Sequence, residues 1–192
     1  MLGRRGPSQS KAQTGYGLTM GRTIFICNAL EDVTRLERDI VTDSPAASKK
    51  IFEMAYALRS VGEQAVILSM GRGTAKRNHS FYKSKVVRIN GVVVIYAPFS
   101  HIPVLSQLLS IVSMPYLLFL LSSYCGETAV VFYNRTSAYI TTLLTSVFLG
   151  VNRVLDLEDA ELINEGSRSP HQLFLRGKRF IYDKLCSGGT IL

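Results

Sequence analysis

The sequence predicts an α/β fold, a Rossmann-like parallel sheet with flanking helices. Apolar runs of strand length alternate along the chain with longer runs whose apolar residues recur every three or four positions, which is the pattern of β-α-β units. Proline and glycine residues stand where such helices would begin and end. A length of 192 residues with 47% hydrophobic content is enough for one domain with a full core.

Residues 1–22 are basic and polar, and we expect a flexible tail there. The apolar run behind them, Thr23 to Leu30, is too short and too soon followed by acids to be a secretory signal. Its β-branched and aromatic residues predict a buried strand. A polar linker, Glu31 to Pro45, comes next.

The end of this linker carries a helix-start signal, with Asp43 or Ser44 as the N-cap and Pro45 in the first turn. From Ala47 onward, apolar residues recur at three- and four-residue steps between charged ones. We therefore predict an amphipathic helix that ends at Gly62.

Three further segments complete the first half of the chain. The run Gln64 to Met70 predicts a second strand, and Gly71 to Lys85 predicts a basic loop. The run Val86 to Phe99 predicts either one strand or a hairpin that turns at Asn90 and Gly91.

The segment Ile102 to Tyr124 carries no charged residue and, as one helix, is long enough to cross a bilayer. Pro103 and Pro115 interrupt it, and serines are spread through it. Two interpretations stay open, because periodicity does not separate a buried helix from a spanning one. In the first, the segment forms one or two helices that are packed in a soluble core or lie on a membrane surface. In the second, it spans the membrane.

The second half repeats the pattern. Thr128 to Asn134, Ser137 to Leu149 and Asn152 to Asp159 predict a strand, a helix and a strand, with Gly150 ending the helix. Beyond them the chain becomes polar, and a basic helix is predicted around Leu173 to Cys186.

Candidate site residues follow from the predicted fold. In an open parallel sheet, ligands bind beyond the carboxyl ends of the strands, where loops and helix N-termini converge. The polar residues expected at that edge are Asp43, Ser44, Asn134, Arg135, Glu158 and Asp159.

Each candidate also has a purely structural interpretation. Asp43, Ser44 and Asn134 suit helix caps, and Arg135 suits either an exposed position or a phosphate or carboxylate ligand. The acids Glu158 and Asp159 suit either a solvated loop near a helix start or the recognition of sugar hydroxyls, where one carboxylate could take a proton from an attacking hydroxyl. These alternatives stay open in the sequence.

Several classes of site receive no support. The chain has neither a P-loop ending nor a G-x-G-x-x-G fingerprint, and its three cysteines have no metal-site spacing, so we predict no cofactor and no metal. The net charge of +8 suits phosphates, nucleic acid or anionic lipid. Few aromatic residues are interleaved with the basic loop, which makes nucleic acid the weakest of the three partners.

Two stretches, DSPAASKKIFEMAYALRSVGEQAVILSMGRG and YNRTSAYITTLLTSVFLGVNRVLDLEDAEL, together with the order of the segments, resemble the N-terminal half of a family 4 type glycosyltransferase of the GT-B fold. The resemblance covers residues 23–192 and implies a Rossmann-like, acceptor-side domain. It implies that Asp43 and Ser44 lie in the acceptor-side loop, that Asn134 and Arg135 lie in the cleft loop, and that Glu158 and Asp159 form the acidic segment.

Two departures limit what the resemblance implies. Many relatives have a glycine-rich turn after the first strand, and some have a His or an acid where this chain has Asn134 and Arg135, so no general base is assigned. The C-terminal donor domain is absent from these 192 residues. Without it we expect the chain to bind an acceptor and not to turn it over, since the leaving nucleotide's charge needs stabilising groups.

Function and partners are expected accordingly. The first expectation is transfer of a sugar from a nucleotide-sugar, bound only by a separate or missing donor domain, to a lipid-linked or polysaccharide acceptor. The second is a non-catalytic module that binds an anionic membrane surface and recruits a partner. The resemblance implies a cytoplasmic protein or one peripheral to the inner face of the cell membrane.

Overall fold

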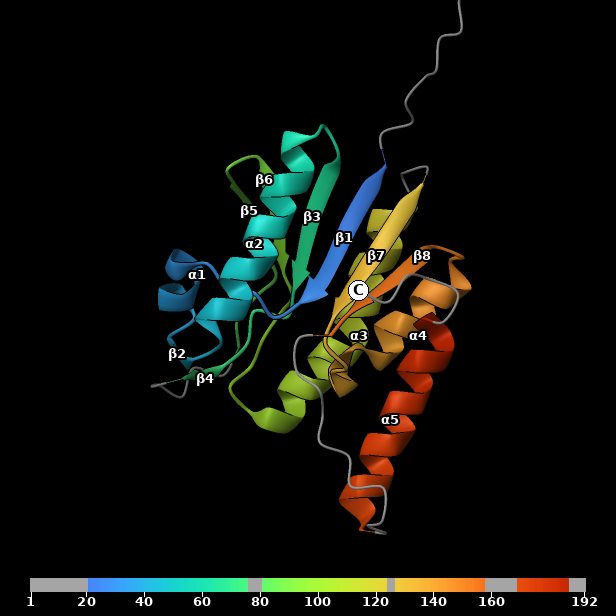
Figure 1. Cartoon of the computed structure of the whole chain (residues 1–192). Helices are drawn as coiled ribbons and strands as arrows, with labels where there is room; N and C mark the ends of the chain where they lie inside the picture. The colour runs from blue at the N-terminus through green and yellow to red at the C-terminus, as the bar shows by residue number, and fades with distance from the viewer. Residues whose placement is uncertain (1–20, 76–80, 124–126, 158–168, 187–192) are drawn as a thin grey trace, which may run out of the picture.

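The computed structural model describes residues 21–75, 81–123, 127–157 and 169–186 (Figure 1). A six-stranded sheet has the order β5-β6-β3-β1-β7-β8, and all neighbouring strands are parallel except the antiparallel pair β5 and β6. The predicted α/β fold with a mostly parallel sheet is therefore confirmed. The strands are β1 (Arg22–Cys27), β3 (Gln64–Ser69), β5 (Lys85–Ile89), β6 (Val92–Tyr96), β7 (Thr128–Tyr133) and β8 (Asn152–Asp156).

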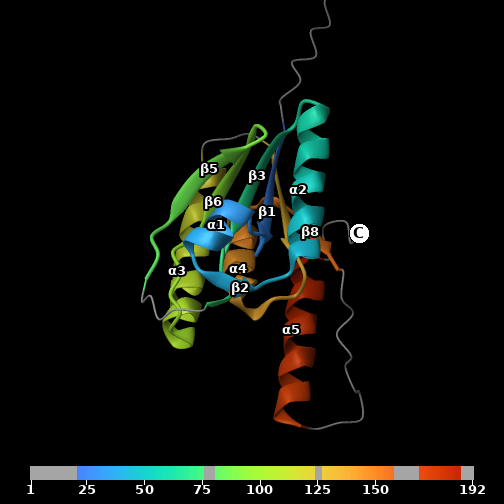
Figure 2. The same cartoon turned by 90° about the vertical axis from the view of Figure 1, so that its left-hand side faces the viewer.

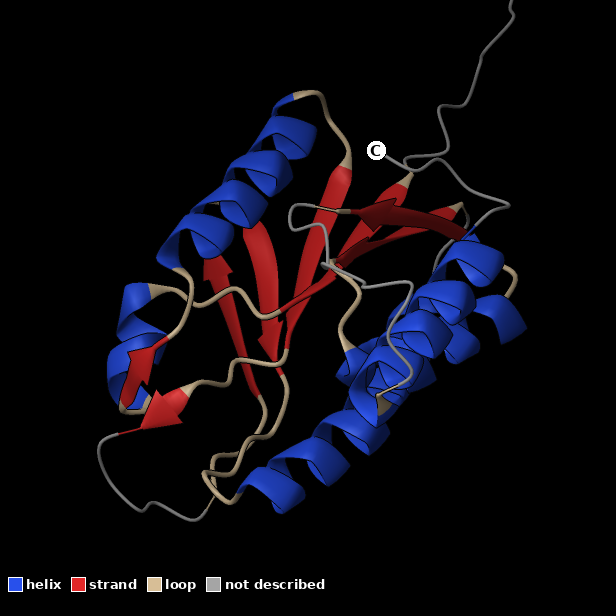
Figure 3. Cartoon of the chain, turned by 60° about the horizontal axis from the view of Figure 1, so that its bottom comes forward, coloured by secondary structure: helices blue, strands red, loops and turns tan. Residues whose placement is uncertain are grey.

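Helices cover both faces of this sheet, with α2 on one face and α3 on the other (Figures 2 and 3). A second, two-stranded sheet pairs the short strands β2 and β4 antiparallel. The remaining elements are α1 (Asp32–Glu37), β2 (Ile40–Thr42), α2 (Pro45–Ser60), β4 (Thr74–Ala75), α3 (Pro103–Ser122), the 3-10 helix η1 (Ser137–Tyr139), α4 (Ile140–Phe148) and α5 (Pro170–Cys186).

The chain order creates a switch point beside the central strand β1. From β1 the chain crosses by α2 to β3, whereas α3 brings it back across the other face to β7, on the opposite side of β1. The loops that follow β1 and β7 therefore diverge at the carboxyl edge, and they leave a crevice there.

Helix α2 forms as its sequence predicts. Ser44 is the N-cap, its Oγ accepting a hydrogen bond from the Ala47 N–H at 3.4 Å, and Pro45 occupies the first turn. Its apolar face buries Ile51 and Ala55 against the sheet. Removing such side chains from water is the main favourable contribution to the packing of the helix.

The opposite face of the sheet is covered by α3, α4 and α5. Met114 and Leu118 of α3, Leu143 of α4 and Tyr182 of α5 are fully buried in one cluster with residues of the four central strands and β8. The Tyr182 hydroxyl donates a hydrogen bond to the Thr136 carbonyl oxygen at 2.7 Å, which ties α5 to the loop after β7.

The segment Ile102 to Tyr124 forms one helix, α3, in spite of its internal Pro115. Proline has no N–H, so the carbonyl of Ile111, four residues earlier, lacks its helical partner. The Thr141 hydroxyl of α4 donates to that carbonyl oxygen at 3.0 Å. A contact between helices thus replaces the bond that Pro115 removes.

Helix α3 has two different faces. By length and composition it is able to cross a membrane, with a mean hydropathy of 2.0, a property shared by core helices of soluble proteins. One side is buried on the sheet, at Ser106, Ser110, Met114 and Leu118. The other side leaves large apolar side chains exposed, among them Val104, Leu108, Val112, Tyr116 and Phe119.

The first half of the chain contains a hairpin, and it contains three short elements in segments predicted as a linker and a loop. The run Val86 to Phe99 is part of a hairpin, with positive φ at both Asn90 (47°) and Gly91 (83°), as a tight hairpin turn requires. The predicted polar linker contains α1 and β2. The predicted basic loop contains β4, and residues 76–80 within it lie outside the described chain, as does most of the predicted tail.

Candidate functional site

A pocket lies at the switch point, beyond the carboxyl ends of β1, β3 and β7. Its volume is about 250 Å³. Loops after three strands and the first turns of α2 enclose it, as expected for a ligand site of an open parallel sheet. The lining residues are Cys27, Asn28, Ala29, Ser44, Ala47, Ile51, Met70, Arg72, Tyr133, Asn134, Thr136 and Tyr139.

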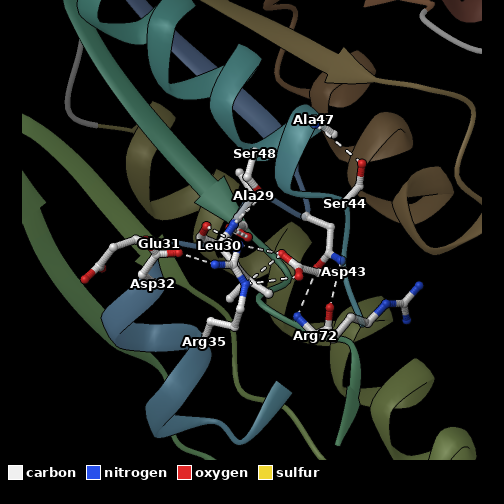
Figure 4. Close-up of polar contacts among 12 residues, drawn as sticks. Ala29, Leu30, Glu31, Asp32, Arg35, Asp43, Ser44, Ala47, Ser48 and Arg72 are labelled. Carbon is white, nitrogen blue, oxygen red and sulfur yellow. Dashed lines mark hydrogen bonds and ion pairs between the residues drawn. The ribbon is translucent and has the colours of Figure 1, made fainter. Parts of the chain in front are cut away.

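Two of the loops are joined by paired hydrogen bonds. The Asn28 side chain donates to the Arg72 carbonyl oxygen at 2.8 Å and accepts from the Arg72 N–H at 2.9 Å. The Ser69 hydroxyl donates to the Ala29 carbonyl oxygen at 2.6 Å and accepts from the Gly71 N–H at 3.0 Å. These contacts hold the backbone of Arg72 beside the end of β1 (Figure 4).

A buried arginine also stabilises the turn after β3 that contains Gly71 and Arg72. Arg38, at the end of α1, is 2% exposed and donates to the carbonyl oxygens of Gly71 at 2.7 Å and Ala97 at 3.0 Å. Burial lowers the pKa of its guanidinium from 12.5 to about 10, which still leaves it charged at neutral pH. Gly71 has φ of +55°, and a Cβ there would lie 2.6 Å from Arg38 Nη1.

The structure gives Asp43 and Ser44 different roles. The Asp43 carboxylate accepts three hydrogen bonds from the Arg35 guanidinium at 2.8, 3.0 and 3.1 Å, and its side chain is only 4% exposed (Figure 4). It is thus committed to an ion pair, which joins α1 to the start of α2 and raises the pKa of Arg35. Ser44 caps α2 and also lines the pocket.

Asn134 and Arg135, although adjacent in sequence, lie in different surroundings. Asn134 lines the pocket with a φ of +62°, a conformation that asparagine tolerates, and its N–H donates to the Asp156 carbonyl oxygen at 2.8 Å. The Arg135 guanidinium instead forms an ion pair with Asp183 of α5 at 2.6 Å. Arg135 is not a lining residue, and its contact is with the neighbouring helix.

Among the acids that end β8, Asp156 is described, while Glu158 and Asp159 lie outside the described residues. The Asp156 carboxylate is 3.0 Å from Lys50 Nζ of α2, and that ammonium group lies 5.4 Å from the centre of the Tyr133 ring. This contact joins α2 to β8 above the sheet edge. The ion pair of Asp156 with Lys50 therefore stabilises the packing of α2 against β8 beside the pocket.

Neither of two titratable groups in the pocket ionises near neutral pH. Burial raises the pKa of the Cys27 thiol from 9.0 to about 12 and the pKa of the Tyr139 hydroxyl well above its usual 10. The lining residues include no His, Asp or Glu. Among the residues that the structure describes, no group of three or more His, Cys, Asp or Glu could hold a metal ion. The described lining offers amides, hydroxyls and one guanidinium as hydrogen-bonding groups.

Sequence reasoning missed Asn28 and Arg72. Asn28 directly follows β1, and Arg72 comes three residues after the end of β3, at the same sheet edge as the end of β7, so the rule that selected Asn134 would have selected them. The sequence treats Arg72 as one of many basic loop residues, and only its position in space separates it from the others.

No family model, curated protein or solved structure matches this chain.

Proposed function

We propose that this domain is the acceptor-binding half of a glycosyltransferase of the GT-B type. It would hold a lipid-linked or polysaccharide acceptor while a nucleotide-sugar-binding domain, joined to it or separate, supplies the donor. The observation that carries this proposal is the switch-point pocket, in which side-chain amides and hydroxyls from three loops converge. Amides both donate and accept hydrogen bonds, which suits the hydroxyl groups of a sugar.

The pocket's own residues support binding more than catalysis. Acceptor activation needs a group that takes a proton from the attacking hydroxyl, and the lining residues include no carboxylate or imidazole. In the proposed enzyme, the acids Glu158 and Asp159, which come shortly after β8 in the sequence, are the candidates for that role. The donor domain would supply the stabilisation of the leaving nucleotide.

Titration calorimetry with oligosaccharide and lipid-linked acceptors tests the proposal. We expect Asn134→Asp to weaken acceptor binding by about fivefold, because it replaces an amide donor with an acceptor-only carboxylate, and each such hydrogen bond contributes about 1 kcal/mol. Asn152→Asp, the same change at the other end of the sheet, should leave the affinity unchanged. Unaltered acceptor binding in both Asn134→Asp and Asp159→Asn would remove the proposed acceptor site.

An enzymatic assay tests the other half of the proposal. The chain alone should transfer no sugar, and activity should appear when a nucleotide-sugar-binding domain is joined or added. Sugar transfer by the 192-residue chain alone would contradict the proposal that a second domain must bind the nucleotide-sugar.

A second candidate is a module that binds an anionic membrane surface, favoured by the exposed apolar residues of α3 and their neighbours on α4. Leu144 and Phe148 of α4 are 50% and 85% exposed, beside the exposed side of α3. Exposed apolar side chains gathered on neighbouring helices are typical of protein or membrane contacts. Because the chain also carries a net charge of +8, we expect salt-sensitive binding to vesicles that contain phosphatidylserine, and no binding at low salt would contradict it.

A further inference from the structure

We propose that the switch-point pocket binds a phosphate group through the guanidinium of Arg72. Among the described residues that line the pocket, Arg72 is the only charged one. Its backbone forms two hydrogen bonds with the Asn28 side chain, and Arg38 donates to the carbonyl oxygen of the preceding residue, Gly71. The Arg72 side chain extends away from these contacts (Figure 4). Within the described chain, the guanidinium forms no ion pair and no hydrogen bond.

Among the described residues, the other buried or partly buried arginines have interaction partners, Arg22 and Arg176 included. Arg35 bonds to Asp43 and Arg135 bonds to Asp183. Arg38 donates to backbone carbonyls, and Arg153 does the same, to Leu185 at 2.9 Å and Val151 at 2.7 Å. Since buried charges are normally paired, a half-buried guanidinium without a partner at the edge of a pocket points to a ligand that completes it.

The surrounding electrostatics favour an anion. Among the described residues, the acids Asp43 and Asp156 on the flanking elements are each neutralised by their own cation, Arg35 and Lys50. Ser44 and Ala47 bring the positive end of the α2 dipole to the pocket wall. Burial lowers the pKa of Arg72 without removing its charge at neutral pH.

A phosphate fits this combination because a guanidinium offers it two parallel hydrogen bonds and a helix N-terminus adds a favourable dipole. The identification of the ligand as part of the acceptor rests on the proposed glycosyltransferase function. The acceptor would then be a phosphorylated sugar or a sugar linked to lipid through phosphate, and Arg72 would hold its phosphate while Asn134 contacts its hydroxyls.

The test titrates inorganic phosphate, glucose 1-phosphate and glucose into the full chain at constant ionic strength, followed by amide chemical shifts. We expect both inorganic phosphate and glucose 1-phosphate to change the amide chemical shifts of the pocket residues, and these changes should reach a plateau as the ligand concentration rises. Arg72→Gln should weaken phosphate binding at least tenfold, Arg72→Lys should weaken it less, and Arg88→Gln, at an exposed position of edge strand β5, should have no effect. Arg72→Gln removes no internal ion pair, so the variant should keep the stability of the parent chain.

Absence of phosphate binding, or equal binding in Arg72→Gln, would overturn the proposal. Vesicles that contain a polyprenyl phosphate, compared with soluble glucose 1-phosphate, separate the two sources of the phosphate, and Arg72-dependent binding of either one supports the site. The two proposals fail differently. Acceptor binding that ignores Arg72 would remove the phosphate site alone, whereas Arg72-dependent phosphate binding with no affinity for any glycan would remove the acceptor function alone.

Discussion

Replacement of Arg38 by methionine tests how the turn that carries Arg72 is held. The guanidinium donates to the buried carbonyls of Gly71 and Ala97, with a third, longer contact of 3.3 Å to Lys83, and it lies 5.3 Å from the centre of the Tyr96 ring. Methionine fills the channel of the aliphatic stem but provides no donor.

The expected loss follows from these contacts. A buried carbonyl left without a partner costs about 1–3 kcal/mol, so the Gly71 and Ala97 carbonyls together cost roughly 2–6 kcal/mol. Folding of the variant does not have to remove a charged guanidinium from water, and this saving in free energy offsets part of the cost. We expect the free energy of unfolding to fall by about 3 kcal/mol.

Urea unfolding followed by circular dichroism measures this loss, with Arg88→Met as the matched control on the exposed side of β5. The control should change the free energy of unfolding by less than about 0.5 kcal/mol. Phosphate affinity should fall in Arg38→Met as well, because the Gly71 carbonyl is released and Arg72 follows it. A loss of stability below about 1 kcal/mol would show that water or a shifted backbone satisfies these carbonyls, and it would refute the support proposed for the turn.

Three further predictions concern the same edge of the sheet. Gly71→Ala should destabilise the fold by about 2 kcal/mol in thermal unfolding, because φ is +55° and the new Cβ would meet the Arg38 guanidinium; an unchanged melting temperature would contradict this. The Cys27 thiol has its pKa raised from 9.0 to about 12, so the stability that this group contributes is complete below pH 9 and is lost as the pH rises toward 12. Between about pH 8 and pH 10.5 the wild type should lose about 2 kcal/mol more than Cys27→Ala, and parallel pH profiles would count against a buried thiol. The pair Lys50 and Asp156 should show a coupling of about 1 kcal/mol in a double-mutant cycle with Lys50→Met and Asp156→Asn, and a coupling near zero would mean that solvent screens the contact.

Most of the fold could be predicted from the sequence because its signals are local. The cap at Ser44, the helical spacing behind it and the glycine at position 62 lie within a few residues of the structure that they specify. The hairpin at Asn90 and Gly91 is of the same kind, since both residues tolerate the positive φ of the turn.

Helix α1 was missed because its stabilising contacts are distant or unusual. Its sequence is typical of a polar linker, yet Arg35 forms an ion pair with Asp43. Arg38 donates hydrogen bonds to the carbonyl oxygens of Gly71 and Ala97. Burying an arginine against backbone carbonyls contradicts the rule that charged residues stay exposed. Only a fold that brings these carbonyls together makes the interior position acceptable.

By itself, the sequence determined the kinds of element, their order and the sheet edge where polar residues gather. Only the tertiary structure decided which of those residues face a ligand. Asp43 and Arg135 are turned to ion partners, Asn134 and Ser44 line the pocket, and Arg72 is left with its charge unpaired within the described chain. The physical reason is that a charge selects its partner by distance in space, across 48 residues for Arg135 and Asp183 and 106 for Lys50 and Asp156, whereas helix and strand signals act between near neighbours.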